Sequence, residues 1–169
     1  MRYSLLILSL SGCFAPTSGT WTTSAGDVTS STCAERDENP VRAGVSLTLQ
    51  PIDKGAFRLR LTGTPAYGCS LQGKDFTCGT KHEDINASDD GEAVLHRATS
   101  IYGSFLDPSS LYAYRKTEVT CEGETCADVA DAQARTFPCE ATASFGATFT
   151  DSAIDQGDTD AAPAPDTGE

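Results

Sequence analysis

The stretch CSLQGKDFTC, residues 69 to 78, decides the fold of this chain. Gly73 and Lys74 fit a two-residue type II′ turn, because glycine accepts the positive φ that its first central position requires. Such a turn sets Cys69 opposite Cys78 in a non-hydrogen-bonded pair, where Cα atoms approach to about 4.5 Å. That distance lies within disulfide range, so the stretch predicts a β-hairpin closed by a Cys69–Cys78 bond.

The same register gives this hairpin an apolar face. Leu71 is set opposite Phe76, on the side that also carries the two cysteines. Cross-strand apolar pairs of this kind stabilise a sheet that packs on a core. The hairpin is therefore expected to be part of a larger antiparallel sheet.

Segments on both sides of the hairpin also alternate with period two. Leu47 and Leu49 share one face of residues 45–52, and Phe57, Leu59 and Leu61 share one face of 56–63, with a glycine-ended turn at 53–55 between them. Further strands are expected over 99–106, 111–121 and 139–149, a polar loop over 83–92, and a short helix over 127–135. These patterns predict a mostly-β chain: a single antiparallel β-sandwich or small barrel of about seven to nine strands, stapled by disulfides.

The other cysteines complete the disulfide framework. In CEGETC, residues 121 to 126, Gly123 opens a second two-residue turn that would bring Cys121 opposite Cys126. Cys33 and Cys139 then pair by elimination, joining the beginning of the domain to its end. The sequence has no C-x-x-C motif, so we expect neither a zinc site nor any other metal site.

The seventh cysteine follows a short apolar run at the N-terminus. Arg2, the run of residues 5–10 and the small residues before Cys13 have the order of a signal peptide. The tetrapeptide Leu10-Ser11-Gly12-Cys13 resembles the lipobox of bacterial lipoproteins, in which the cysteine is lipidated and becomes the mature N-terminus. The alternative is an ordinary secretory signal with Cys13 as a bystander.

The lipobox resemblance implies a location and a domain order. Phe14 stands where an aspartate would retain the protein at the inner membrane, so the resemblance implies lipid anchoring in the Gram-negative outer membrane, facing the periplasm or the cell surface. Residues 1–12 would be the cleaved signal peptide, 13–20 the lipidated cysteine and a tether, and 21–150 the β domain. Residues 151–169 have six acidic and no basic residues, which is typical of a disordered tail.

Composition and motifs exclude several functions. The formal charge of −12 argues against nucleic-acid binding, which needs a basic patch. None of the common hydrolase or nucleotide-binding motifs occurs, so we expect no catalytic residue and no cofactor, although a triad assembled across the fold is a third hypothesis. The leading hypothesis is a non-catalytic binding or structural module. Its candidate binding face is Tyr112, Tyr114 and Lys116, which share one side of a strand and, if exposed, would suit a protein partner at the envelope.

Gly19 and Trp21 form a G-x-W sequence near the start of the β domain. This resembles the opening of lipocalins, in which the tryptophan closes one end of an eight-stranded barrel around an apolar ligand. The resemblance implies an alternative function, a carrier of a small apolar ligand.

Overall fold

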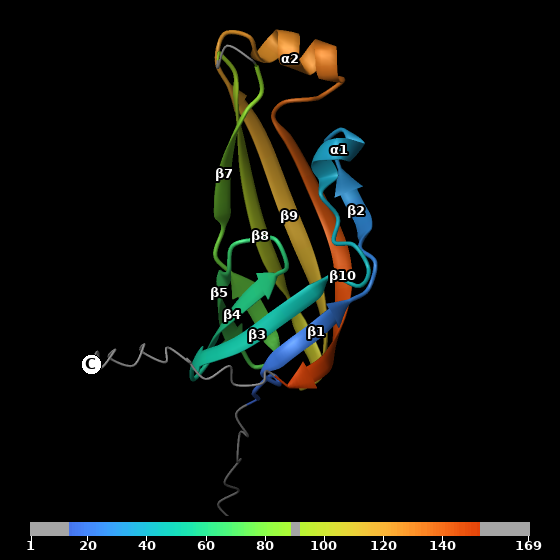
Figure 1. Cartoon of the computed structure of the whole chain (residues 1–169), viewed down its shortest axis with the longest axis vertical. Helices are drawn as coiled ribbons and strands as arrows, with labels where there is room; N and C mark the ends of the chain where they lie inside the picture. The colour runs from blue at the N-terminus through green and yellow to red at the C-terminus, as the bar shows by residue number, and fades with distance from the viewer. Residues whose placement is uncertain (1–13, 89–91, 153–169) are drawn as a thin grey trace, which may run out of the picture.

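The chain forms a closed antiparallel barrel with an extension at one end (Figure 1). The computed structural model describes residues 14–88 and 92–152. Its elements are β1 (Gly19–Thr23), β2 (Asp27–Ser31), α1 (Glu35–Glu38), β3 (Ser46–Asp53), β4 (Ala56–Leu61), β5 (Tyr67–Gln72), β6 (Asp75–Cys78), β7 (Lys81–Asn86), β8 (Val94–Asp107), β9 (Ser110–Glu122), α2 (Cys126–Gln133) and β10 (Cys139–Ser152).

Eight strands close the barrel in the order β1-β3-β4-β5-β6-β8-β9-β10, and β10 pairs back to β1. Each strand is antiparallel to its neighbour, so this is an up-and-down barrel. The mostly-β, disulfide-stapled class is confirmed, and of the two expected architectures the structure has the barrel. β2 and β7 pair with β10 and β8 outside the closed circuit.

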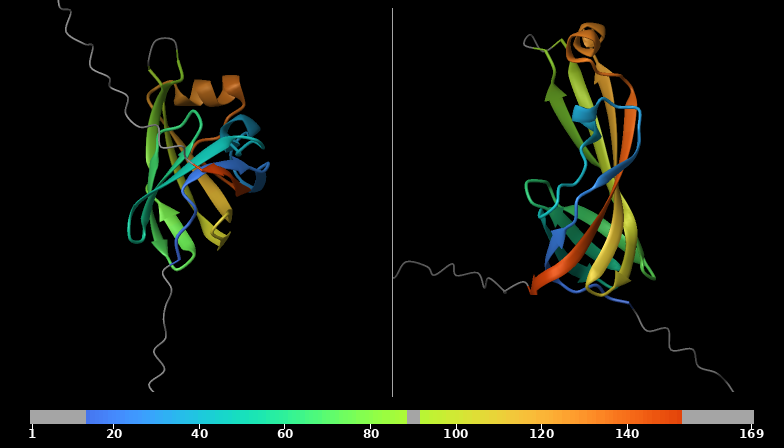
Figure 2. Two further views of the ribbon diagram at one scale, coloured as in Figure 1. Left: turned by 60° about the horizontal axis from the view of Figure 1, so that its bottom comes forward. Right: turned by 90° about the vertical axis from the view of Figure 1, so that its right-hand side faces the viewer.

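The molecule has two unlike halves, called lower and upper as oriented in Figure 1. The lower half is the closed barrel. Because β8, β9 and β10 have 14, 13 and 14 residues, they continue above it as an open sheet, edged by β7 and β2. The helix α2 lies over the top of this sheet, and α1 lies beside β2 (Figure 2).

Aromatic side chains fill the lower half. Trp21 is fully buried, and its ring meets those of Phe105 and Phe149 edge-on at centroid distances of 6.0 and 6.1 Å. Its indole Nε1 donates a hydrogen bond to the carbonyl of Thr17. All the predicted inward residues of β3 and β4 are buried around this centre: Leu47, Leu49, Phe57, Leu59 and Leu61.

The hairpin of β5 and β6 confirms the turn, register and bond expected from residues 69–78. Gly73 has a φ of 64° whereas Lys74 has a negative φ, as a type II′ turn requires. Cys69 faces Cys78 with Cα atoms 3.9 Å apart, and the disulfide joins them.

The other two disulfides join the predicted pairs, Cys33 to Cys139 and Cys121 to Cys126, but the setting predicted for the second bond was wrong. Cys121 ends β9 and Cys126 begins α2, so the bond ties a strand to a helix and no hairpin forms. Residues 126–133 are rich in alanine, which favours helix over strand. Gly123 has a φ of 128°, and a Cβ there would lie 1.9 Å from the carbonyl oxygen of Glu92, so this turn requires glycine.

Several predicted boundaries also differ from the structure. Residues 83–86, expected in a polar loop, belong to β7, because the pairing with β8 accommodates their polar side chains. Residues 14–88 and 92–152 contain ten strands, more than the expected seven to nine, and the short helix α1 was not predicted. Strand β1 begins at Gly19, inside the expected tether, and β10 runs to Ser152, inside the expected tail. The remainder of that tail, Cys13 and the predicted signal peptide lie outside the described residues.

Candidate functional site

A band of polar side chains crosses the inner face of the sheet at the upper mouth of the barrel. Inward positions recur at every second residue of a strand, and the ladder of β7, β8 and β9 brings five charged or polar ones together. They are Lys81 and Glu83 from β7, Arg97 and Thr99 from β8, and Arg115 from β9. The inward positions above and below this band carry apolar residues such as Leu95 and Ala113.

Two carboxylates neutralise two of the arginines in this region. Arg97 lies 3.3 Å from Glu83 across the strands and 3.9 Å from Asp37 of α1. Asp37 is fully buried and also lies 3.1 Å from Arg135, which follows α2. Neither Asp37 oxygen makes a well-aligned hydrogen bond, so charge attraction holds the carboxylate in place.

Arg115 and Lys81 form no such ion pair, although Glu83 and Tyr67 attract the Arg115 guanidinium from a longer distance. No residue in the described ranges forms an ion pair or a side-chain hydrogen bond with either of them. Burial lowers the pKa of the Arg115 guanidinium, which nevertheless stays protonated because its ordinary value is so high. A cation withdrawn from water without a counter-ion is unfavourable to the free protein.

Neutral hydrogen-bond donors lie beside these cations. Burial raises the pKa of Tyr67, which keeps its phenol protonated and able to donate. Thr99 lies on the same wall, and Thr117, its partner on β9, is fully buried with a hydroxyl that has no hydrogen-bond partner. The site therefore has more donors than the fold uses.

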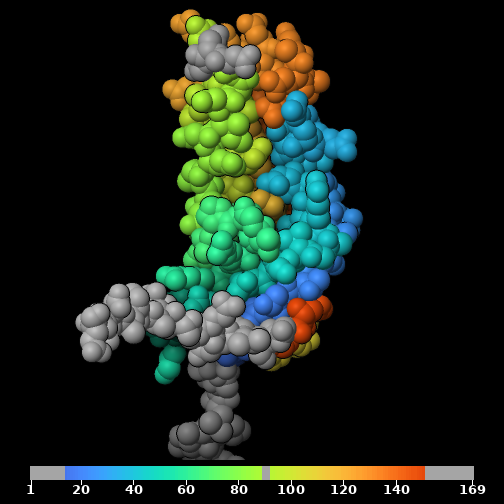
Figure 3. Space-filling model, viewed as in Figure 1, coloured from blue at the N-terminus to red at the C-terminus, as the bar shows by residue number. Residues whose placement is uncertain are grey.

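Arg115, Lys81, Tyr67 and Thr99 line a pocket of about 230 Å³, called the arginine pocket below. Its rim is the β4–β5 connection, residues 63–65, together with Asn39 and the edge of β7; its full lining is Asn39, Gly63, Thr64, Pro65, Tyr67, Lys81, His82, Glu83, Arg97, Thr99 and Arg115. Figure 3 shows the surface hollowed at this height, with yellow and gold atoms of β8 and β9 visible between β7 and the chain near α1.

The sequence contains a signal for this pocket, although it belongs to no known motif. If Tyr112, Tyr114 and Lys116 face outward, alternation sends Arg115 inward. The same alternation along β8 puts Arg97 on the side of the buried Leu95. A charged residue at an inward position of a strand is rare and costly, so it indicates either a buried ion pair or a site.

The predicted binding face, Tyr112, Tyr114 and Lys116, lies on the outer side of the barrel. Tyr102 of β8 stacks on Tyr114 with ring centroids 5.3 Å apart, and Tyr112 meets Tyr114 edge-on at the same distance. Lys116 lies 2.9 Å from both Glu118 and Glu140, and hydrogen bonds with these carboxylates raise the pKa of the lysine. The structure thus assembles a partly exposed aromatic cluster beside a neutralised lysine.

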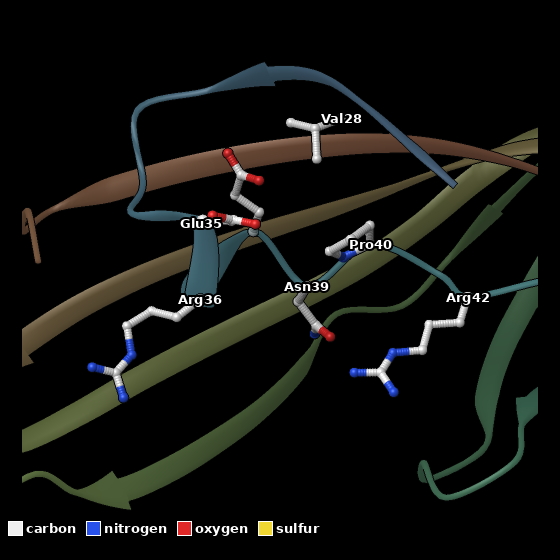
Figure 4. Close-up of a pocket in the computed structure, with 7 residues that line it drawn as sticks. Val28, Glu35, Arg36, Asn39, Pro40 and Arg42 are labelled. Carbon is white, nitrogen blue, oxygen red and sulfur yellow. The ribbon is translucent and has the colours of Figure 1, made fainter. Parts of the chain in front are cut away.

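A wider groove of about 680 Å³ lies between β2 and the chain around α1 (Figure 4). Figure 4 shows Arg36 and Arg42 extending on the side of the α1 segment that is turned away from Val28. These charged residues are exposed and of both signs. Water already solvates them, so the groove offers a ligand less than the arginine pocket does.

An apolar pocket of about 330 Å³ lies at the lower end of the barrel. Its lining includes Phe14, Pro16, Pro51, Phe57 and Leu71. The ring of Phe14 packs on Phe105 at 5.5 Å. The N-terminal segment therefore forms one wall of this pocket.

Neither histidine is arranged as a catalytic base in the described part of the chain. His96 points outward, with Nδ1 2.7 Å from Asp84 and Nε2 3.2 Å from Glu122, and His82 hydrogen-bonds no serine, threonine or cysteine. Among residues 14–88 and 92–152, no cluster of three His, Cys, Asp or Glu side chains is placed to hold a metal ion.

None of the helices in the described ranges is long and apolar enough to span a membrane. Comparisons with protein-family models, curated proteins and solved structures found no match to this chain.

Proposed function

We propose that this protein is an exported, non-catalytic binding module that takes a small water-soluble ligand in the arginine pocket. We propose further that a lipid on Cys13 anchors it to the outer membrane of a Gram-negative cell. The observation that carries the binding function is the pair of cations, Arg115 and Lys81, that line a hollow without forming an ion pair with any described residue. A ligand that supplies the missing partner removes the cost of burying an unpaired charge.

The position of the N-terminal segment supports the anchor. Phe14 packs on Phe105, and the amide of Thr17 donates to the carbonyl of Pro108, so residue 14 lies at the lower end of the barrel. A lipid on the preceding residue would hold that end near the membrane and leave the arginine pocket facing away from it. Three disulfides agree with an oxidising compartment outside the cytoplasm.

One preparation tests both parts of the proposal. The full chain is purified in detergent from the membrane fraction of its own host, and its intact mass is measured before and after reduction. The proposal predicts a chain that begins at Cys13, carries several acyl groups, and gains six hydrogens as its three disulfides open. Native mass spectrometry should then detect a small bound molecule that the Arg115→Met variant lacks. An unmodified chain would contradict the anchor, and equal ligand occupancy in the variant would contradict the site.

A carrier of a small apolar ligand is the second candidate. The closed eight-stranded barrel, with Trp21 buried in its lower half and an apolar pocket beside Phe14, favours it. The neutral dye N-phenyl-1-naphthylamine tests this function by fluorescence. Saturable binding that Leu71→Glu abolishes and Arg115→Met leaves intact would establish the carrier, whereas unsaturable binding would exclude it.

A further inference from the structure

The charges around the arginine pocket do not balance. Asp37 and Glu83 form ion pairs with Arg97 and Arg135, whereas Arg115 and Lys81 form none, so the region has an excess of two positive charges. The chain as a whole carries a formal charge of −12, so this local excess of positive charge is the opposite of the molecular average. A pocket of one sign with low-dielectric walls concentrates ligands of the other sign.

We infer that the arginine pocket binds a small oxyanion, a carboxylate or phosphate group, with Arg115 as its principal contact and Lys81 as its second cation. This inference rests on the proposed function, since it names the class of ligand for the same site. The shared chemistry of the two groups is a compact cluster of anionic oxygens.

The donors present match such a cluster. A guanidinium offers five N–H groups in a planar fork that fits two oxygens at once, whereas an ammonium attracts them as a point charge. The Nε atom of Arg115 has no hydrogen-bond partner among the described residues, but it is buried, so the ligand contacts assigned to this arginine are its outer N–H groups. Tyr67 and Thr99 add neutral O–H donors on the adjoining wall. An oxyanion can accept from the N–H and O–H groups among these that face the pocket, and an ionised carboxylate has no proton that would need an acceptor in return.

The size of the pocket and its charges exclude other ligand classes. Its volume of about 230 Å³ falls below the 300–1,000 Å³ typical of drug-sized ligands, which restricts it to small molecules. A cationic ligand would be repelled by Arg115 and Lys81. An apolar ligand would remove water from both cations without replacing it, at a cost that apolar contacts in so small a site do not offset.

Isothermal titration of the full-length protein in detergent tests this inference. Inorganic phosphate and succinate are the probes, at constant ionic strength maintained with chloride. Both should bind saturably, at one site per chain, and the tighter of the two identifies the type of oxyanion. Loss of a charged hydrogen-bond pair is worth about 1.5–3 kcal/mol, so Arg115→Met should weaken binding at least about tenfold.

Two further variants control for folding and for net charge. Arg115→Lys keeps the positive charge but removes the planar guanidinium, and it should reduce affinity less than Arg115→Met does. Arg60→Met removes the same charge from the exposed outer face of β4, and it should leave affinity within about twofold of the wild type. Equal losses in Arg60→Met and Arg115→Met would overturn the inference, because they would show a non-specific charge effect.

Acylation of Lys81 distinguishes failure of the oxyanion inference from failure of the proposed function. A bound ligand should protect Lys81 from acetic anhydride, while the exposed Lys54 at the opposite end of the barrel stays reactive. Protection by phosphate or succinate supports both. Protection by an uncharged sugar but by neither anion overturns the oxyanion inference and leaves the binding function standing. Protection by none of these probes, with no saturable titration, overturns both.

Discussion

The lower and upper halves of this molecule are stabilised in different ways. The lower half is a closed barrel packed with aromatic rings, and one short disulfide, Cys69–Cys78, clamps its hairpin. The upper half is an open sheet whose buried apolar cluster contains Leu95, Val119 and Cys139, and the other two disulfides lie there. Packing therefore holds the half that closes, and covalent bonds hold the half that carries the polar pocket. Because disulfides stabilise the upper half, its inner face can include charged side chains in place of apolar ones.

Removal of the Cys33–Cys139 disulfide should have the largest effect. The bond spans 106 residues, and in the chain-entropy model a loop of about this size contributes about 4.7 kcal/mol, compared with about 2.7 kcal/mol for the short loop of Cys69–Cys78. Urea denaturation of the two double alanine variants measures both losses of unfolding free energy. Equal losses, or a larger loss for the hairpin bond, would show that the upper half does not depend on its clamp.

Matched leucines compare the packing of the two halves. Leu59 in the lower core and Leu95 in the upper cluster are both essentially buried. Truncation to alanine costs about 2–5 kcal/mol, depending on how far the surroundings relax into the cavity. We expect Leu59→Ala near the upper limit and Leu95→Ala near the lower one, as measured by the free energy of unfolding. A reversed order would contradict the assignment of the lower half as the packed core.

Arg115→Met should make the ligand-free protein more stable. Replacing an unpaired, partly buried cation with an apolar side chain of similar length removes a desolvation cost, and we expect a gain on the order of 1 kcal/mol. Thermal unfolding in a buffer without phosphate or carboxylate measures it. A marked loss of stability would show that Arg115 has a structural partner in the fold and would contradict an unpaired cation.

The smallest expected effect concerns His96 on the outer face of the upper sheet. The hydrogen bond with Asp84, and then that with Glu122, raises the pKa of His96 above its ordinary value of 6.5. A raised pKa in the folded state means that the protonated histidine stabilises the fold at low pH, and that this contribution disappears as pH rises through the folded value. His96→Gln should therefore lower the melting temperature more at pH 5.5 than at pH 8.5. An equal effect at both pH values would contradict the raised pKa.

The two halves also differ in how much the sequence reveals. In the lower half, period-two alternation identified Leu47, Leu49, Phe57, Leu59 and Leu61, and a single glycine turn identified the β5–β6 register, because each feature depends on neighbours in the chain. In the upper half the decisive contacts are long-range. Asp37 meets Arg97 and Arg135 only through the folded topology, and the helix at Cys126 replaced a hairpin that local turn chemistry favoured. Alternation around Tyr114 does place Arg115 inward, but sequence alone does not show that the arginine forms no ion pair with the described residues around it.

Nuclear magnetic resonance titration tests the central claim most directly. Inorganic phosphate is added to the ¹⁵N-labelled full-length protein at constant ionic strength, and the Nε–H signal of Arg115 is followed with the backbone amides. The arginine pocket predicts saturable shifts at Arg115, Thr99 and Lys81, with the outer-face residues Arg58 and Arg60 unchanged. Shifts that rise without saturation, or that centre on the outer arginines, would contradict it.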